Sequence, residues 1–145
     1  MKIGFLITAR LKSSRLPLKL LEIIEGEELI TQVIHRIQEL KDVSKVVLCT
    51  SINPQDEALV DIAKREGIES FIGNEEDVLQ RLLAAAELHD LDYLIGITGE
   101  NPLFSIEHTK KVIELAKKGE YDFISPKGLP IGCATYALKT EALKL

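Results

Sequence analysis

The stretch KIGFLITARLKSSRLPLK (residues 2–19) holds both a clear strand signal and a concentrated positive charge. Residues 2–8 are a nearly continuous apolar run, which predicts a strand buried on both faces of a parallel sheet. The basic segment follows this strand directly, and open α/β sheets bind their ligands beyond the carboxyl ends of their strands. We therefore expect a ligand site in the loop that begins at residue 9.

The rest of the chain repeats this alternation of strand and helix. Further strands are predicted at residues 45–50, 69–72, 93–98, 121–125 and 133–138. Amphipathic helices are predicted at residues 29–40, 54–66, 75–90 and 105–119, with a last helix starting at residue 140. Asn53 and Ser105 are expected to cap two of these helices, and Gly67 and Gly119 to end them. Strand–helix–strand connections of this length are right-handed, so we expect an α/β fold over residues 1–145, a single domain with a mainly parallel sheet and helices on both faces.

The charge of the chain is unevenly distributed. The formal net charge is −5, yet residues 1–21 contain five Lys and Arg residues and no acid. A protein that binds a nucleic acid polymer is usually basic over a broad surface, whereas one basic loop on an acidic chain favours a small, compact anion. The loop matches neither GxGxxG nor GxxxxGK[ST], which argues against a dinucleotide fold and a P-loop. A solvated basic loop without function is the alternative that composition alone leaves open.

The cysteines and the hydropathy pattern bear on location. Cys49 and Cys133 lie 84 positions apart without CxxC spacing, which is typical of reduced thiols, and we expect both to be buried apolar residues. The first residues are too short an apolar run for a secretory signal, and no stretch is long enough to span a membrane. We expect a cytoplasmic protein with no membrane partner.

The order of residues in the basic loop is more specific than its charge. The pattern A-R-x-x-S-x-R-L-P-x-K is matched by Ala9, Arg10, Ser13, Arg15, Leu16, Pro17 and Lys19. It resembles the nucleotide-binding signature of the cytidylyltransferases that activate sugar acids, in the variant of SpsF-like spore coat polysaccharide proteins and acylneuraminate cytidylyltransferases. Two later segments resemble further motifs of that family: residues 71–87 its G-x-x-x-D-V-L-x-R, and residues 97–104 its T-G-D-x-P-L turn.

The resemblance implies a nucleotide-diphospho-sugar transferase type of sandwich, shortened at the C-terminus, in a nucleotide-binding domain. It implies transfer of CMP from CTP to a sugar acid in polysaccharide or glycan synthesis, with Mg²⁺ as cofactor and a homodimer left open. Arg10 and Lys19 would be the catalytic residues that hold the phosphates, and Glu100 would be the metal ligand. The nucleotide-binding residues would be Ala9, Arg10, Ser13, Arg15, Lys19 and Asp77.

Several alternatives stand beside these assignments. Residues 99–102 could form a plain turn, and Asp77 could simply pair with Arg81 one helical turn away. The base could be uracil or guanine, because backbone groups usually read it. The main alternative in another functional class is a catalytically silent nucleotide-binding domain, because Ile52, Ala134 and Tyr136 stand where the resemblance leads us to expect acids. His35, His89 and His108 show no ligand spacing and are expected to be surface or hydrogen-bonded helix residues.

Overall fold

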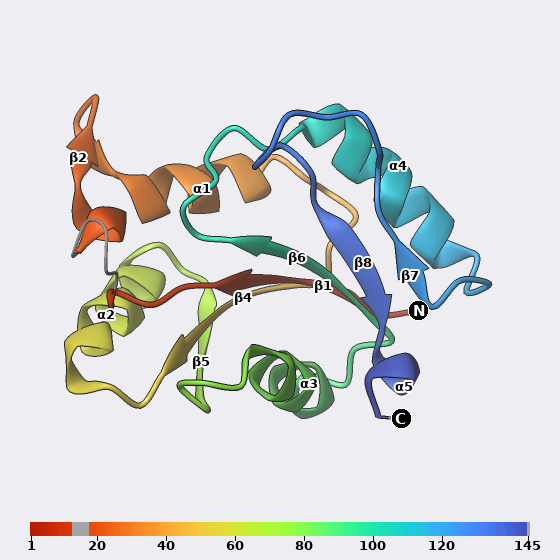
Figure 1. Ribbon diagram of the computed structural model, residues 1–145, viewed down its shortest axis with the longest axis horizontal. Coiled ribbons are helices and arrows are strands. Elements are labelled where there is room, and N and C mark those ends of the chain that lie inside the picture. The colour runs from red at the N-terminus through yellow and green to blue at the C-terminus, as the bar shows by residue number, and fades with distance from the viewer. Residues whose placement is uncertain (13–17, 145) are drawn as a thin grey trace.

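A six-stranded sheet forms the centre of the molecule (Figure 1). The computed structural model describes residues 1–12 and 18–144. Its strands follow the order β5 (Glu69–Gly73), β4 (Lys45–Ser51), β1 (Ile3–Thr8), β6 (Tyr93–Thr98), β8 (Tyr136–Lys139) and β7 (Phe123–Ile124). The first four strands are parallel, and β8 runs antiparallel to both of its neighbours. The predicted α/β fold with a mainly parallel sheet is confirmed.

Helices cover both faces of this sheet. On one face lie α1 (Leu29–Ile37), α2 (Glu57–Arg65) and α4 (Ile106–Lys117), and on the other lie α3 (Val78–Leu88) and α5 (Thr140–Leu143). In Figure 1, α1 and α4 lie above the sheet and α3 and α5 below it. Strand β1 shows why its sequence is apolar throughout, since Phe5 and Ile7 enter one core and Leu6 the other. No helix within the described ranges combines the length and hydropathy that crossing a bilayer requires.

The predicted helix boundaries are largely confirmed. The side chain of Asn53 accepts a hydrogen bond from Gln55 N at 3.1 Å, although the first turn there is a 3-10 helix, η2 (Pro54–Asp56). Ser105 Oγ accepts from His108 N at 3.1 Å and caps α4. Burial raises the pKa of the Cys49 thiol to about 12, in keeping with its predicted place in the core, whereas Cys133, also expected to be buried, is only half-buried.

A short hairpin before α1 was not predicted. Strands β2 (Ile23–Ile24) and β3 (Glu27–Glu28) pair antiparallel, after a 3-10 turn, η1 (Lys19–Leu21). The two turn residues between them, Glu25 and Gly26, have φ angles of +53° and +87°, as a type I′ turn requires. Each strand is only two residues long, and Ile23 and Ile24 are both exposed. Such short strands show no alternation of apolar and polar residues from which the sequence could predict them.

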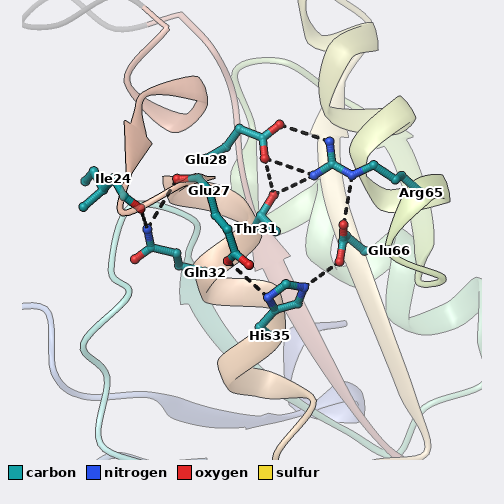
Figure 2. Close-up of polar contacts among 8 residues, drawn as sticks. All are labelled: Ile24, Glu27, Glu28, Thr31, Gln32, His35, Arg65 and Glu66. Atoms are coloured by element: carbon teal, nitrogen blue, oxygen red, sulfur yellow. Dashed lines mark hydrogen bonds and ion pairs between the residues drawn. The ribbon is translucent and has the colours of Figure 1, made fainter.

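An ion-pair network fixes this hairpin to two helices (Figure 2). Arg65 at the end of α2 donates to both carboxylate oxygens of Glu28, at 3.1 and 3.0 Å. His35 on α1 lies between two acids, 3.2 Å from Glu27 Oε2 and 2.6 Å from Glu66 Oε1. The network therefore connects β3, α1 and the carboxyl end of α2 on the surface of the molecule.

Candidate functional site

A pocket of about 270 Å³ lies beyond the carboxyl ends of β1 and β6. These strands are adjacent and parallel, with Thr8 opposite Thr98. The strands that follow β1 in the chain, β4 and β5, lie on one side of it in the sheet, and β6 lies on the other side. This is the switch point at which open α/β sheets bind ligands. The lining comes from the basic loop, from the start of α3 and from the turn after β6: Thr8, Ala9, Arg10, Lys12, Val78, Arg81, Thr98 and Glu100.

The structure brings Arg10 to this pocket and gives it a backbone partner. Arg10 Nη1 donates to the carbonyl oxygen of Glu75 at 2.5 Å, which connects the loop after β1 to the loop before α3. The preceding residue, Ala9, is buried and donates its N–H to Cys49 O at 3.1 Å. The guanidinium is therefore placed by two elements far apart in the sequence.

Lys19 is not part of the pocket lining, but it contacts Glu100, which is. Lys19 Nζ lies 2.9 Å from Glu100 Oε2, and the two side chains are 42% and 50% exposed. Glu100 sits in a tight turn that Asn101 closes by donating its side-chain amide to Thr98 Oγ1 at 2.8 Å. The residues assigned to the phosphates and to the metal thus come together, though 81 positions separate them.

Asp77 does not line the pocket, although it was assigned to the nucleotide. Its carboxylate accepts from Gln80 N at 3.0 Å and caps α3. The alternative pairing with Arg81 is not adopted either, since Arg81 Nη1 donates to Asn74 O at 3.0 Å. The two remaining assigned residues, Ser13 and Arg15, lie outside the described residues.

Arg81 lines the pocket, although it was not among the assigned nucleotide-binding residues. Its side chain is among the largest that are fully buried, and within the described chain its buried Nε has no hydrogen-bond partner. Burial and, after it, the charge of Arg10 lower the pKa of Arg81, while Cys49 and Asp56 act in the opposite direction. The motif D-V-L-x-R was the signal for it, because arginine is rarely buried, although helical spacing puts it on the same face as the buried Leu82 and Ala85.

A buried acid, Asp56, lies behind the basic loop. It is 1% exposed, and its two carboxylate oxygens accept from Leu11 N at 2.7 Å and from Ser51 Oγ at 2.5 Å. No sequence pattern singled it out, because these partners lie on other segments.

The donor set at the pocket suits a magnesium ion that is shared with a ligand. Glu100 is the carboxylate in the lining, and the described residues contain no cluster of three His, Cys, Asp or Glu side chains that could hold a metal by themselves. Mg²⁺ is commonly held by one or two carboxylates together with substrate phosphates and waters. With Arg10, Lys12 and Arg81 beside this one acid, the lining is positive overall, as a polyanionic ligand requires.

Comparisons with known proteins give matches over nearly the whole chain. A sequence profile described as cytidylyltransferase matches residues 5–145. A solved structure of a cytidylyltransferase from Leptospira borgpetersenii serovar Hardjo-bovis superposes with a TM-score of 0.92 at 27% identity, covering 99% of this chain and 63% of that one.

Curated relatives match over most of the chain. An uncharacterized protein of Methanocaldococcus jannaschii is 32% identical, and the match covers 99% of this chain and 59% of the relative. The spore coat polysaccharide biosynthesis protein SpsF of Bacillus subtilis is 30% identical, with 88% and 55% covered. A 3-deoxy-manno-octulosonate cytidylyltransferase of Chloroherpeton thalassium is 31% identical, with 93% and 50% covered. The chain therefore spans about half to three fifths of the length of these relatives.

Proposed function

The chain belongs to the cytidylyltransferase family, and on this basis we propose that it binds CTP at the pocket beyond β1 and β6 and transfers CMP to a sugar acid. The observation that carries the proposal is the convergence of Arg10, Lys19 and Glu100 around one pocket. Two cations and one carboxylate at a switch point are the groups that a nucleoside triphosphate with its metal ion calls for.

The proposed reaction is a substitution at the α-phosphorus of CTP. A hydroxyl oxygen of the acceptor forms a bond to this phosphorus and loses its proton to water, while the bond from the phosphorus to the bridging oxygen of the β-phosphate breaks and pyrophosphate leaves with the electron pair. Negative charge grows on the phosphate oxygens along this path, so fixed cations stabilise the transition state more than the ground state. Arg10 and Lys19 would supply that charge: Arg10 through guanidinium N–H groups other than the one that donates to Glu75 O, and Lys19 by exchanging Glu100 for phosphate oxygens.

Glu100 is the residue that we assign to Mg²⁺. It would contribute one carboxylate oxygen, and the ion would neutralise charge on the triphosphate and orient it. Release of Glu100 from Lys19 would then accompany the arrival of the nucleotide. The chain's own residues contribute binding and orientation to this scheme.

The proposal also includes the acceptor, the pathway and the location of the protein. Two relatives carry names that refer to polysaccharide biosynthesis and to 3-deoxy-manno-octulosonate, which supports a sugar acid and a role in surface glycan synthesis. The free thiols of Cys49 and Cys133 suit a cytoplasmic site of action. A homodimer is part of the same proposal.

A catalytically silent nucleotide-binding domain is the second candidate. Ile52 at the end of β4 is 72% exposed and stands where the family resemblance leads us to expect an acid, so the chain offers fewer carboxylates than that resemblance implies. Such a domain would still bind nucleotide through Arg10 and Lys19. Its affinity for CTP would barely depend on Mg²⁺.

Two measurements on the chain separate these candidates. The first is pyrophosphate release from CTP and Mg²⁺ with a panel of sugar acids that includes 3-deoxy-manno-octulosonate, with Arg10→Ala as control. The second is thermal unfolding with CTP, UTP, GTP and ATP, where ligand at about 100 times its dissociation constant stabilises by roughly 2.7 kcal/mol. Turnover lost in Arg10→Ala supports the transferase. CTP binding that ignores Mg²⁺, without turnover, supports the silent domain, and no binding of any nucleotide contradicts both.

A further inference from the structure

The carboxylate of Asp56 is placed as a bridge between two segments. It stands between β4 and α2, but its oxygens point away from the helix it precedes: the Asp56 side chain makes no capping hydrogen bond to α2. Instead, Oδ2 accepts from Ser51 Oγ at the end of β4, and Oδ1 accepts from the backbone N–H of Leu11 at 2.7 Å. An acid before a helix is ordinarily explained by capping or by the helix dipole, and neither explains this orientation.

Leu11 connects Asp56 to the residues at the pocket. Its N–H is held by Asp56, and its carbonyl oxygen accepts from Leu18 N at 3.3 Å. Arg10 precedes Leu11 directly, and Lys19 follows Leu18. One backbone residue, fixed by one buried carboxylate, is therefore adjacent in the chain to Arg10 and hydrogen-bonded to the neighbour of Lys19.

The contact is strong for two physical reasons. A hydrogen bond from a backbone amide to a carboxylate is charge-assisted, and here the pair is buried, where such bonds are worth more than in water. Ser51 Oγ holds the other oxygen and itself accepts from Asn53 N at 3.1 Å, so the carboxylate cannot easily rotate away.

A second bridge joins the same two regions from the other side. Asn53 Nδ2 donates to Glu75 Oε1 at 3.2 Å, and Glu75 O accepts from Arg10. The segment after β4 therefore reaches Arg10 by two routes: through the backbone at Leu11 and through the loop that receives the guanidinium. The backbone next to Arg10 and the guanidinium of Arg10 are therefore both held in position relative to β4.

We propose that Asp56 is a positioning residue, which fixes the backbone at Leu11 and thereby orients Arg10 and Lys19 toward the phosphates of the nucleotide. The inference rests on the proposed function for its ligand, but the fixing of Leu11 does not require any ligand. Asp56 acts through other residues and touches no reacting atom.

The first arm of the test is amide hydrogen exchange at Leu11 in the ligand-free chain, followed by NMR. Asp56→Ala should raise the exchange rate of this amide by about tenfold or more relative to the amides of β1, because its acceptor is gone. Asp56→Asn keeps an oxygen that can accept from Leu11 N and should restore most of the protection. If Asp56→Ala does not fold, Ser51→Ala takes its place and should give a smaller increase, since it frees only Oδ2.

Tyr93→Phe is the matched control. Tyr93 is fully buried, and its hydroxyl donates to Tyr121 O from the amino end of β6, the end of the strand opposite the pocket. The variant loses one part-buried hydrogen bond, whereas Asp56→Ala loses two buried ones, so it should lower the melting temperature while leaving Leu11 as protected as in the wild type.

The second arm measures CTP dissociation constants by calorimetry. Asp56→Ala should weaken CTP binding about tenfold in the wild-type background and about threefold in the Arg10→Ala background, where only its effect through Lys19 remains. Wild-type exchange at Leu11 in Asp56→Ala would overturn the inference, and so would equal losses in both backgrounds. A wild-type chain that binds no CTP would overturn the proposed function, and the exchange rates would still decide whether Asp56 positions the loop.

Discussion

The ammonium group of Lys19 lies 2.9 Å from Oε2 of Glu100, so the residues assigned to the phosphates and to the metal hold each other when no ligand is bound. A triphosphate would compete for the lysine and a magnesium ion for the glutamate. Each ligand would thereby release the partner that the other one needs. If both ligands bind as proposed, this ion pair would couple the binding of the nucleotide to the binding of the metal ion.

Substitution of either partner should separate stability from ligand binding. Because the pair is about half exposed, Lys19→Met and Glu100→Gln should each change the free energy of unfolding by less than about 1 kcal/mol. Lys19→Met should weaken CTP binding by about 10- to 100-fold, the loss expected when a hydrogen bond to a charged group is removed. Glu100→Gln should remove the gain in CTP affinity that Mg²⁺ brings, which calorimetry with and without Mg²⁺ measures.

The surface pair Lys45–Glu69 provides the control for these variants. Its side chains are similarly exposed, and it lies at the amino ends of β4 and β5, at the edge of the sheet opposite the pocket. Lys45→Met should leave CTP binding unchanged. If Glu100→Gln weakened CTP equally with and without Mg²⁺, the assignment of Glu100 to the metal would be wrong.

Arg10 and Lys12 should differ sharply although both line the pocket. Arg10→Ala should weaken CTP binding by about 10- to 100-fold, because its planar guanidinium is held in place by Glu75 O and can form paired hydrogen bonds to phosphate. Lys12 is exposed and stands at an unmatched position of the loop pattern, so Lys12→Ala should cost less than about threefold and this loss should shrink in salt. Equal effects of the two variants would mean that the loop acts through diffuse charge.

The elements that were correctly predicted are those that neighbouring residues in the sequence determine. Residues 3–7 carry no polar side chain, as a strand covered on both faces requires, and Asn53 and Ser105 cap helices through their own neighbours. The hairpin at residues 23–28 was missed because exposed two-residue strands leave no pattern. Its two turn residues, Glu25 and Gly26, were the signal available.

The site residues could be predicted from the sequence only where a family motif names them, because the sequence alone does not show which distant residues lie close together. Arg10, Lys19 and Glu100 were named from the family resemblance, and the structure brings them together. Asp56 could not be named, because its role depends on contacts with Leu11 and Ser51 that no local pattern encodes. Asp77 shows the converse case, a motif residue whose visible role is the local one of capping α3.

Phe104 should be the most costly single residue of the turn that carries Glu100. Its ring is fully buried, 5.8 Å from the ring of Phe5, and the guanidinium of Arg36 lies 5.4 Å from its centroid. Phe104→Ala should lower the free energy of unfolding by about 3–5 kcal/mol, measured by urea unfolding. The adjacent Leu103 is 74% exposed, so Leu103→Ala should stay within about 0.5 kcal/mol, and a similar cost for both would contradict this account of the turn.

The His35 contacts should make stability fall as the pH rises above neutrality. The hydrogen bond to Glu66 and the charge of Glu27 raise the pKa of His35 above its ordinary value of 6.5, against the opposing effect of burial. A raised native pKa means that the stabilisation is complete below the unfolded pKa of about 6.5 and is lost as the pH passes the native pKa. Urea unfolding of wild type and His35→Gln from pH 5.5 to 9 should show a difference that shrinks toward high pH, and a constant difference would contradict the prediction.

Glu28 should produce the opposite dependence at low pH. Its hydrogen bonds from Arg65, in first place, lower the pKa of Glu28 from 4.5 to about 2. A lowered native pKa means that the stabilisation is present above about pH 4.5 and is lost as the pH falls toward 2. Glu28→Gln keeps the side-chain length and removes the titration, so the stability difference between wild type and this variant should be constant from pH 5 to 7 and decline below pH 4.5. Glu69→Gln, which replaces an exposed acid on the edge strand β5, is the control. If the stability difference between wild type and Glu69→Gln declined below pH 4.5 in the same way, the effect would not belong to the Glu28–Arg65 contact.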